Sequence, residues 1–222
     1  MGIIQSMPYD EQACYKEIKN SLQTGDMILF SGRGGCFSCV IKCATCSPYS
    51  HVGMVVRKGR ELYLWHSADK PLKGSSNNTY YVINDEYSQK PKSGPQLNKL
   101  KDALSIYKGE FVVMKLRKTG NGGYYEITPS LEKYMTHISK KPYEDKPCQL
   151  FLAAYDGPFG ENKIDHSGLF CSELFIDTYK HMGLVQKNVI DSEFTPADLS
   201  RGLSYFLRSG WRLGDTITRI IV

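Results

Sequence analysis

The sequence predicts an α+β domain built on an antiparallel sheet. Short apolar and β-branched runs alternate with a period of two, and amphipathic stretches with helical spacing lie between them. The 222 residues are enough for one domain with a substantial core, and no internal repeat or low-complexity tract interrupts them. We expect an N-terminal anchor or helix segment at 1–21 and a main domain at 22–222.

The strands are expected mainly in the first half of the chain. The apolar run Met27–Phe30 predicts a buried strand after a turn. Residues 51–57 and 61–67 predict a hairpin around the Lys58-Gly59 turn. Alternation along the second strand of this hairpin puts His66 on the face where it can lie beside His51.

Local sequence patterns predict the other helices and strands. Helical spacing, a capping threonine before proline, β-branched runs and turn-rich polar stretches indicate them. In chain order they are an amphipathic helix at 9–22, a surface excursion at 69–96 with one strand at 79–83, a helix at 97–107, a strand at 110–116, a helix at 128–138, a short capped helix at 195–199, and a tail at 205–222, with an apolar run at 217–222, that is either an edge strand or a terminal contact.

Composition excludes several classes of protein. No stretch approaches about 18 consecutive apolar residues, and the start lacks the pattern of a secretory signal, so we expect an intracellular, cytoplasmic protein. The net charge of +5 suits an anionic surface, but Lys and Arg are not clustered, so we expect no nucleic-acid partner. Seven cysteines without an export signal predict thiols.

The first six residues match the pattern in which Gly2 is exposed by removal of Met1 and myristoylated. The alternative is an ordinary frayed terminus. A single myristoyl chain gives only reversible attachment, so peripheral membrane association would need a second signal. The net basic charge and acylation of a nearby cysteine are candidates.

Cys171 stands at the start of an amphipathic helix that Gly183 ends. A thiol in the first helical turn lies near the positive end of the helix dipole, so we expect a lowered pKa and a nucleophile. The alternative is a buried, inert cysteine. A cysteine nucleophile needs an imidazole to take its proton and a polar group to orient that imidazole. His51 and His66 are the candidates for these two roles.

Other histidine, acidic and cysteine residues are further candidates for chemistry. His166, five residues before Cys171, is the rival base, while Glu173 is predicted to be structural and Cys14 and Cys148 to be packed thiols. Two C-x-x-C pairs are typical of zinc sites, but a helix would separate the outer thiols by about 15 Å. Structural packing, S-acylation or redox chemistry, and metal binding therefore stay open for Cys36, Cys39, Cys43 and Cys46.

Four stretches together resemble, in order, the landmarks of the circularly permuted NlpC-like papain-fold superfamily. They are Thr24-Gly25-Asp26-Met27-Ile28-Leu29-Phe30, Ser47-Pro48-Tyr49-Ser50-His51-Val52-Gly53-Met54-Val55, Lys141-Pro142-Tyr143 and Phe170-Cys171-Ser172-Glu173-Leu174. That superfamily includes YiiX-like amidases, a poxvirus virion protein group and, more distantly, lecithin retinol acyltransferase. The resemblance covers most of 22–200.

The resemblance implies a permuted papain-like fold in which the nucleophile helix packs against the sheet. It implies Cys171 as nucleophile, His51 as general base, and His66 in a third position where YiiX-like members often have glutamate. The implied function is a cysteine-dependent hydrolase or acyltransferase acting on an amide or ester of a peptide, a lipid or an acylated protein, with no cofactor and no metal. The alternative is a catalytically inactive, membrane-associated scaffold of the same fold.

Overall fold

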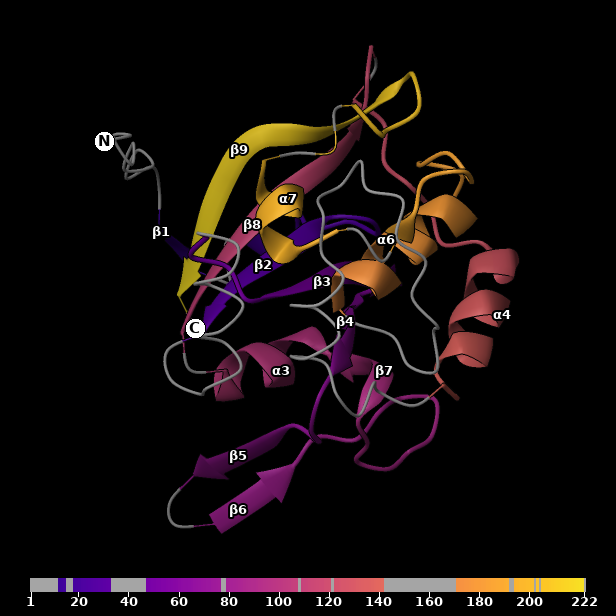
Figure 1. Ribbon diagram of the computed structural model, residues 1–222. Helices are drawn as coiled ribbons and strands as arrows, with labels where there is room; N and C mark the ends of the chain where they lie inside the picture. Colours follow the sequence, from indigo (N-terminus) through magenta and orange to yellow (C-terminus); the bar gives the residue numbers. More distant parts are fainter. Residues whose placement is uncertain are drawn as a thin grey trace.

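The fold is mixed α+β, and strands from the described residues form a seven-stranded sheet in the order β1-β9-β8-β2-β3-β4-β7 (Figure 1). All neighbours are antiparallel except β1 and β9, which are parallel. The computed structural model describes residues 12–14, 18–32, 47–76, 79–107, 109–120, 122–141, 171–191, 194–201, 203 and 205–221.

The strands come from nearly the whole length of the sequence. The main sheet contains β1 (Gln12–Cys14), β2 (Met27–Gly32), β3 (His51–Lys58), β4 (Glu61–Ala68), β7 (Gly94–Lys99), β8 (Gly109–Lys118) and β9 (Trp211–Ile221). A separate hairpin of β5 (Lys73–Ser76) and β6 (Thr79–Val82) extends from one end of the molecule (Figure 1).

Helices cover both faces of the sheet, because side chains alternate between two apolar clusters along each strand. On β3, Val52 and Met54 join one cluster with α4 (Pro129–Ile138), α6 (Cys171–His181) and α7 (Pro196–Ser200). Val55, the residue after Met54, points to the opposite face and joins the other cluster, with α3 (Leu100–Ile106). The sheet is therefore buried on both sides.

Capping residues mark where these helices begin and end, as predicted. Thr128 caps α4 by accepting a hydrogen bond from Leu131 N–H, and Pro129 follows it. Thr195 and Asp198 form a capping box at α7. Gly183, with φ of 75°, ends the turn after α6.

Three hydrogen bonds hold α6 in place. Trp65 Nε1–H donates to Thr178 Oγ1 over 3.0 Å, and Tyr179 O–H donates to the Gly25 carbonyl. Tyr134 O–H donates to Asp177 over 2.7 Å and so joins α4 to α6. These bonds fix α6 relative to β4, to α4 and to the turn before β2.

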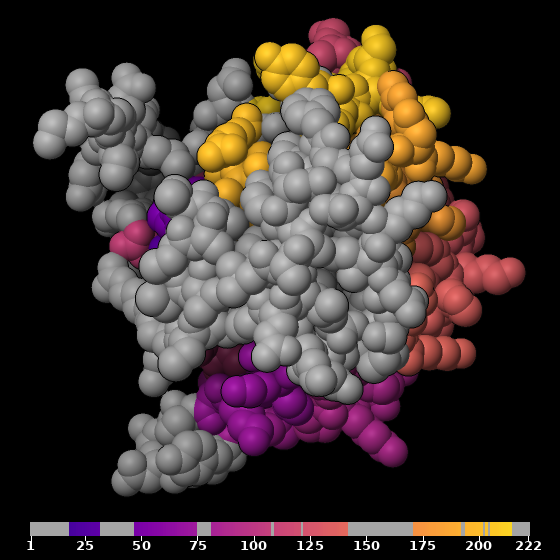
Figure 2. Space-filling model, viewed as in Figure 1, coloured from indigo at the N-terminus to yellow at the C-terminus, as the bar shows by residue number. Residues whose placement is uncertain are grey.

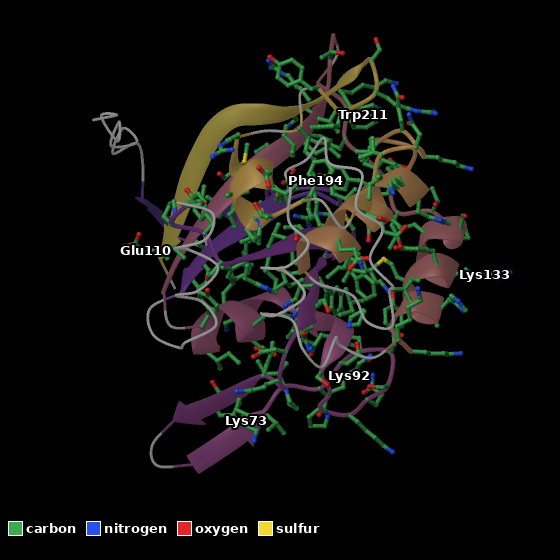
Figure 3. All side chains as sticks on the ribbon, viewed as in Figure 1. Lys73, Lys92, Glu110, Lys133, Phe194 and Trp211 are labelled. Atoms are coloured by element: carbon green, nitrogen blue, oxygen red, sulfur yellow. The ribbon has the colours of Figure 1, made fainter. Side chains whose placement is uncertain are left out.

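Exposed side chains of the helices form the surface, and apolar side chains beneath them form the core. Side chains of α4 form one side of the surface in the space-filling view (Figure 2). Lys133 extends outward from that helix, whereas Phe194 lies in the interior with 2% of its surface exposed (Figure 3). None of the helices within the described ranges is long and apolar enough to cross a membrane.

Several predicted elements are confirmed: the strand beginning at Met27, the hairpin of β3 and β4, the strand at β8, and the helices α4, α6 and α7. The strand expected at 79–83 is β6, and its partner β5 was not predicted. The tail forms the strand β9 from Trp211 onward, but 219–221 do not lie at the edge of the sheet, because β1 pairs beside them.

Two predictions were wrong. Gln12–Cys14, expected within a helix at 9–22, forms β1 because it pairs with β9. The helix expected at 97–107 begins only at Leu100, since 94–99 form β7 and pair with β4. In both places, pairing with a distant strand outweighs a local helical pattern.

Candidate active site

Cys171 is the first residue of α6, and its side chain faces β3. It is 9% exposed. Backbone N–H groups of Cys171, Ser172 and Val52 lie close enough to the sulfur to lower its pKa. Two of these donors belong to the start of the helix, and the third belongs to the residue that follows His51 in β3. The sulfur thus lies where a helix end meets a strand.

The backbone pairing of β3 with β4 does not extend to Val52. The paired residues of the two strands begin at Met54↔Trp65 and continue away from Val52, to Lys58↔Glu61. N–H groups point alternately to the two sides of a strand. Val55 N–H donates to the Asp26 carbonyl beside β2, so Val52 N–H faces the β4 side. This N–H lowers the pKa of the Cys171 thiol and therefore lies beside the sulfur.

A chain of polar side chains crosses three strands beside this opening. His51 Nε2 of β3 lies 2.9 Å from His66 Nδ1 of β4. His66 Nε2 lies 2.9 Å from Asn98 Oδ1 of β7. His66 is 3% exposed and Asn98 is fully buried, whereas His51 is partly exposed. Only the His51 end of this chain of side chains therefore reaches the surface.

Gly53 makes the contact between the two histidines possible. It shares a strand face with His51, and a Cβ at this position would lie 3.2 Å from His66 Cβ and 2.6 Å from Leu64 Cδ1. A larger residue would force His66 or Leu64 to move. The glycine is needed here because another strand approaches closely.

Aromatic rings form one wall of the site. The Phe30 ring lies 5.1 Å from the His51 ring and 4.9 Å from the Tyr107 ring, measured between centroids. The Tyr107 side chain hydrogen-bonds to Ser50, and burial raises its pKa to about 12. Ionisation of Cys171 would raise the pKa of Tyr107 further, so the phenol and the sulfur lie within range of each other's charge.

Burial determines the charge state of the histidines. It lowers the pKa of His51 well below its usual value, and the neighbouring His66 lowers it further. Burial also lowers the pKa of His66 to about 4, although the hydrogen bond to Asn98 and the charge of Asp85 act in the opposite direction. Both rings are therefore neutral at pH 7.

The predicted lowering of the Cys171 pKa was wrong. Burial raises it to about 11, and the charge of Asp69 contributes in the same direction. The N–H groups of the helix start and of Val52 do lower it, as the dipole argument requires, but burial has the larger effect. The resting pair is a thiol and a neutral imidazole.

The structure brings His51 and His66 together, and Cys171 lies beside Val52, the residue that follows His51. Glu173 is buried in the first turn of α6. Within the described residues, no group of three or more His, Cys, Asp and Glu side chains is placed to hold a metal ion. Gly2, His166, Cys148 and the cysteines at 36, 39, 43 and 46 lie outside the described residues, and Cys14 is described only as part of β1.

Sequence reasoning missed Asn98 and Tyr107. Asn98 was overlooked because 97–107 was expected to be helical, which hid its place opposite β4. Recognition of 94–99 as a strand would have put Asn98 next to the His66 strand. No sequence signal marked Tyr107, which follows the end of α3.

No protein-family model and no curated protein matches the chain. Among solved structures, the chain is similar to the metalloprotein yiiX from Escherichia coli O157:H7. The two share 19% identity, the match covers 90% of this chain and 97% of that chain, and the TM-score is 0.45. This likeness is too distant to inform the chemistry, which has to be argued from the residues of this chain.

Proposed function

We propose that the protein is a cysteine-dependent hydrolase or acyltransferase that acts on an amide or ester through Cys171, His51 and His66. One observation carries the proposal. The Cys171 sulfur lies beside the N–H of Val52, the residue next to His51, while His66 occupies the Nε2 side of His51. That leaves Nδ1 as the nitrogen of His51 available to the thiol. A permuted papain-like fold, with the histidine strand before the cysteine helix, is part of this proposal.

The proposed reaction begins with attack of the Cys171 sulfur on the substrate carbonyl carbon. The thiol proton passes to His51 Nδ1, and the backbone N–H of Cys171 donates to the developing oxyanion. The C–N or C–O bond then breaks, and His51 returns the proton to the leaving group. Water or another acceptor resolves the thioester and regenerates the thiol.

The raised thiol pKa and the lowered imidazole pKa favour proton transfer during attack over a resting ion pair. A resting thiolate would face burial without a charged partner, which is unfavourable. In this mechanism His51 acts as a general base while the sulfur–carbon bond forms, as a serine hydrolase uses its histidine.

The substrate is proposed only by class: an amide or ester of a peptide, a lipid or an acylated protein. Myristoylation at Gly2, an intracellular location, and an anchor segment at 1–21 ahead of a catalytic domain at 22–222 complete the proposal. A myristoylated chain would favour substrates at a membrane surface.

The experiment exposes the protein to 4-nitrophenyl esters of short and long acyl chains and to a peptide anilide. Mass spectrometry of the peptide that contains residue 171 then detects the acyl adduct. We expect an adduct in the native protein, none in Cys171→Ala, and at least about a 100-fold slower adduct in His51→Gln. The exposed change His137→Gln is the control. Equal acylation rates in the native protein and His51→Gln would contradict the proposal.

A second candidate is the catalytically inactive, membrane-associated scaffold. The observation that favours it is the raised pKa of Cys171, because a nucleophile is usually prepared by a lowered one. This candidate predicts no adduct with any of the substrates, together with flotation of the myristoylated chain on phosphatidylserine vesicles. Acylation of Cys171 that depends on His51 would exclude it.

A further inference from the structure

Asn98 has a fixed orientation. Its Nδ2–H donates to the Asn84 carbonyl over 3.0 Å, so its amide nitrogen points away from β4. The side chain is fully buried, and its Oδ1 lies 2.9 Å from His66 Nε2. Reversing the amide would place its nitrogen against His66 and its oxygen against a carbonyl that cannot donate. The hydrogen bonds therefore settle which atom faces His66.

This orientation determines where the proton of His66 lies. A carbonyl oxygen only accepts, so His66 Nε2 must carry the hydrogen. A neutral imidazole has a single N–H, which leaves His66 Nδ1 as an acceptor. The atom that faces this acceptor, at 2.9 Å, is His51 Nε2. His51 Nε2 must then be the donor, and His51 Nδ1 has no proton.

We propose that Asn98 is a positioning residue, which acts through His66 to hold His51 in the tautomer whose bare Nδ1 can accept the thiol proton. The relay crosses β7, β4 and β3 and ends at His51, whose neighbour Val52 lies beside Cys171. The positioning role of Asn98 rests on the proposed function, but the assignment of the His66 and His51 tautomers does not. Removing the acceptor at position 98 frees His66 to carry its proton on Nδ1. His51 would then have to accept at Nε2 and present a protonated Nδ1 to the thiol.

Two variants separate the acceptor from the packing. Asn98→Leu keeps a similar volume but removes the acceptor, whereas Asn98→Asp keeps an oxygen against His66. Gln96→Met is the matched control: Gln96 is also a fully buried amide on β7, and it pairs with His66 in the strand register. Its side chain donates to the carbonyls of Lys92 and Gly94 and stands outside the relay.

The measurement is ¹⁵N NMR of the imidazole rings, which distinguishes a protonated from a bare nitrogen and needs no substrate. In the native protein at pH 7 we expect both rings to be protonated at Nε2 only. In Asn98→Leu we expect the proton to appear on Nδ1 of both rings, while Asn98→Asp and Gln96→Met keep the native pattern. We also expect acylation of Cys171 to slow about 100-fold in Asn98→Leu and to recover largely in Asn98→Asp.

The possible failures are distinguishable. A native spectrum with a proton on Nδ1 of His66 or His51 overturns the proposal even if Asn98→Leu does not fold. Native tautomers that persist in a folded Asn98→Leu also overturn it, and leave the proposed hydrolase intact if Cys171 is still acylated. If the tautomers change as expected but the native protein is never acylated, the relay exists and the proposed function fails.

Discussion

The Trp65 indole donates to the Thr178 hydroxyl over 3.0 Å, across 113 positions of the sequence. The same hydroxyl donates to the Leu174 carbonyl one turn earlier in α6. Both residues are almost completely buried. This bond joins the strand that carries His66 to the helix that begins with Cys171.

Thr178→Val should therefore destabilise the fold, because it leaves the buried Trp65 N–H without its acceptor. We expect a loss of about 1–3 kcal/mol in the free energy of unfolding, measured by urea denaturation. The control is the same change in a Trp65→Phe background, where no indole remains to be orphaned. The cost there should be smaller by about 1 kcal/mol, and an equal cost in both backgrounds would mean that the bond contributes nothing.

The raised pKa of Cys171 predicts slow alkylation at neutral pH. With a pKa of about 11, little thiolate is present at pH 7.5, and the alkylation rate should rise continuously up to pH 10. We expect iodoacetamide to modify Cys171 about 100-fold more slowly in the folded chain than in urea, as measured by mass spectrometry of that peptide. A rate that levels off near pH 7 would instead indicate a lowered pKa.

Acid should destabilise the protein through its buried histidines. The folded pKa of His66 is about 4, below the usual 6.5, so between these values the unfolded chain binds a proton that the folded chain does not. Stability is then lost as the pH falls from 6.5 towards 4, by about 3 kcal/mol for this residue alone.

Urea denaturation between pH 4 and pH 7 measures this loss. His66→Gln should make the stability curve shallower over that range, because the variant has no proton to bind on unfolding. His137→Gln, on the exposed side of α4, is the matched control. A native curve and a His66→Gln curve with the same slope would show that His66 is not buried in its neutral form.

Gly53→Ala tests the close approach of β3 to β4. The added methyl group meets Leu64 Cδ1 at 2.6 Å and His66 Cβ at 3.2 Å, so we expect a loss of about 1–2 kcal/mol in stability. We also expect about tenfold slower acylation of Cys171, because His66 moves relative to His51. Gly59→Ala is the control: its φ is +61°, so it costs stability, but nothing lies within 4 Å of the added Cβ. Equal effects of both changes on acylation would rule out the steric explanation.

The parts of the fold that the sequence predicted are those that local signals determine. The hairpin of β3 and β4 combines strict alternation with the Lys58-Gly59 turn, and α4 and α7 start at a threonine followed by proline. The strand β7 has no such signal, because its pairing with β4 is a long-range event and Leu97 also fits a helical pattern. Asn98 was missed together with this strand.

The same distinction explains the thiol. That Cys171 begins a helix could be predicted from the residues after it, and so could a lowering of its pKa by the helix start. The raised pKa comes from burial, which depends on how α6 packs on β3 and therefore on the whole fold. The hairpin pattern predicted that His66 could lie beside His51, and the 2.9 Å contact agrees with it. Their catalytic roles remain a prediction.

The parallel pairing of β1 with β9 has a consequence for truncated forms of the protein. Gln12–Cys14 run beside Arg219–Ile221 and satisfy backbone groups there that would otherwise face solvent. A fragment that begins after Cys14 would present this part of β9 as a bare edge, the kind of surface on which copies of a chain add to one another and aggregate. By pairing with β9, Gln12–Cys14 thus prevent that strand from pairing with another copy of the chain.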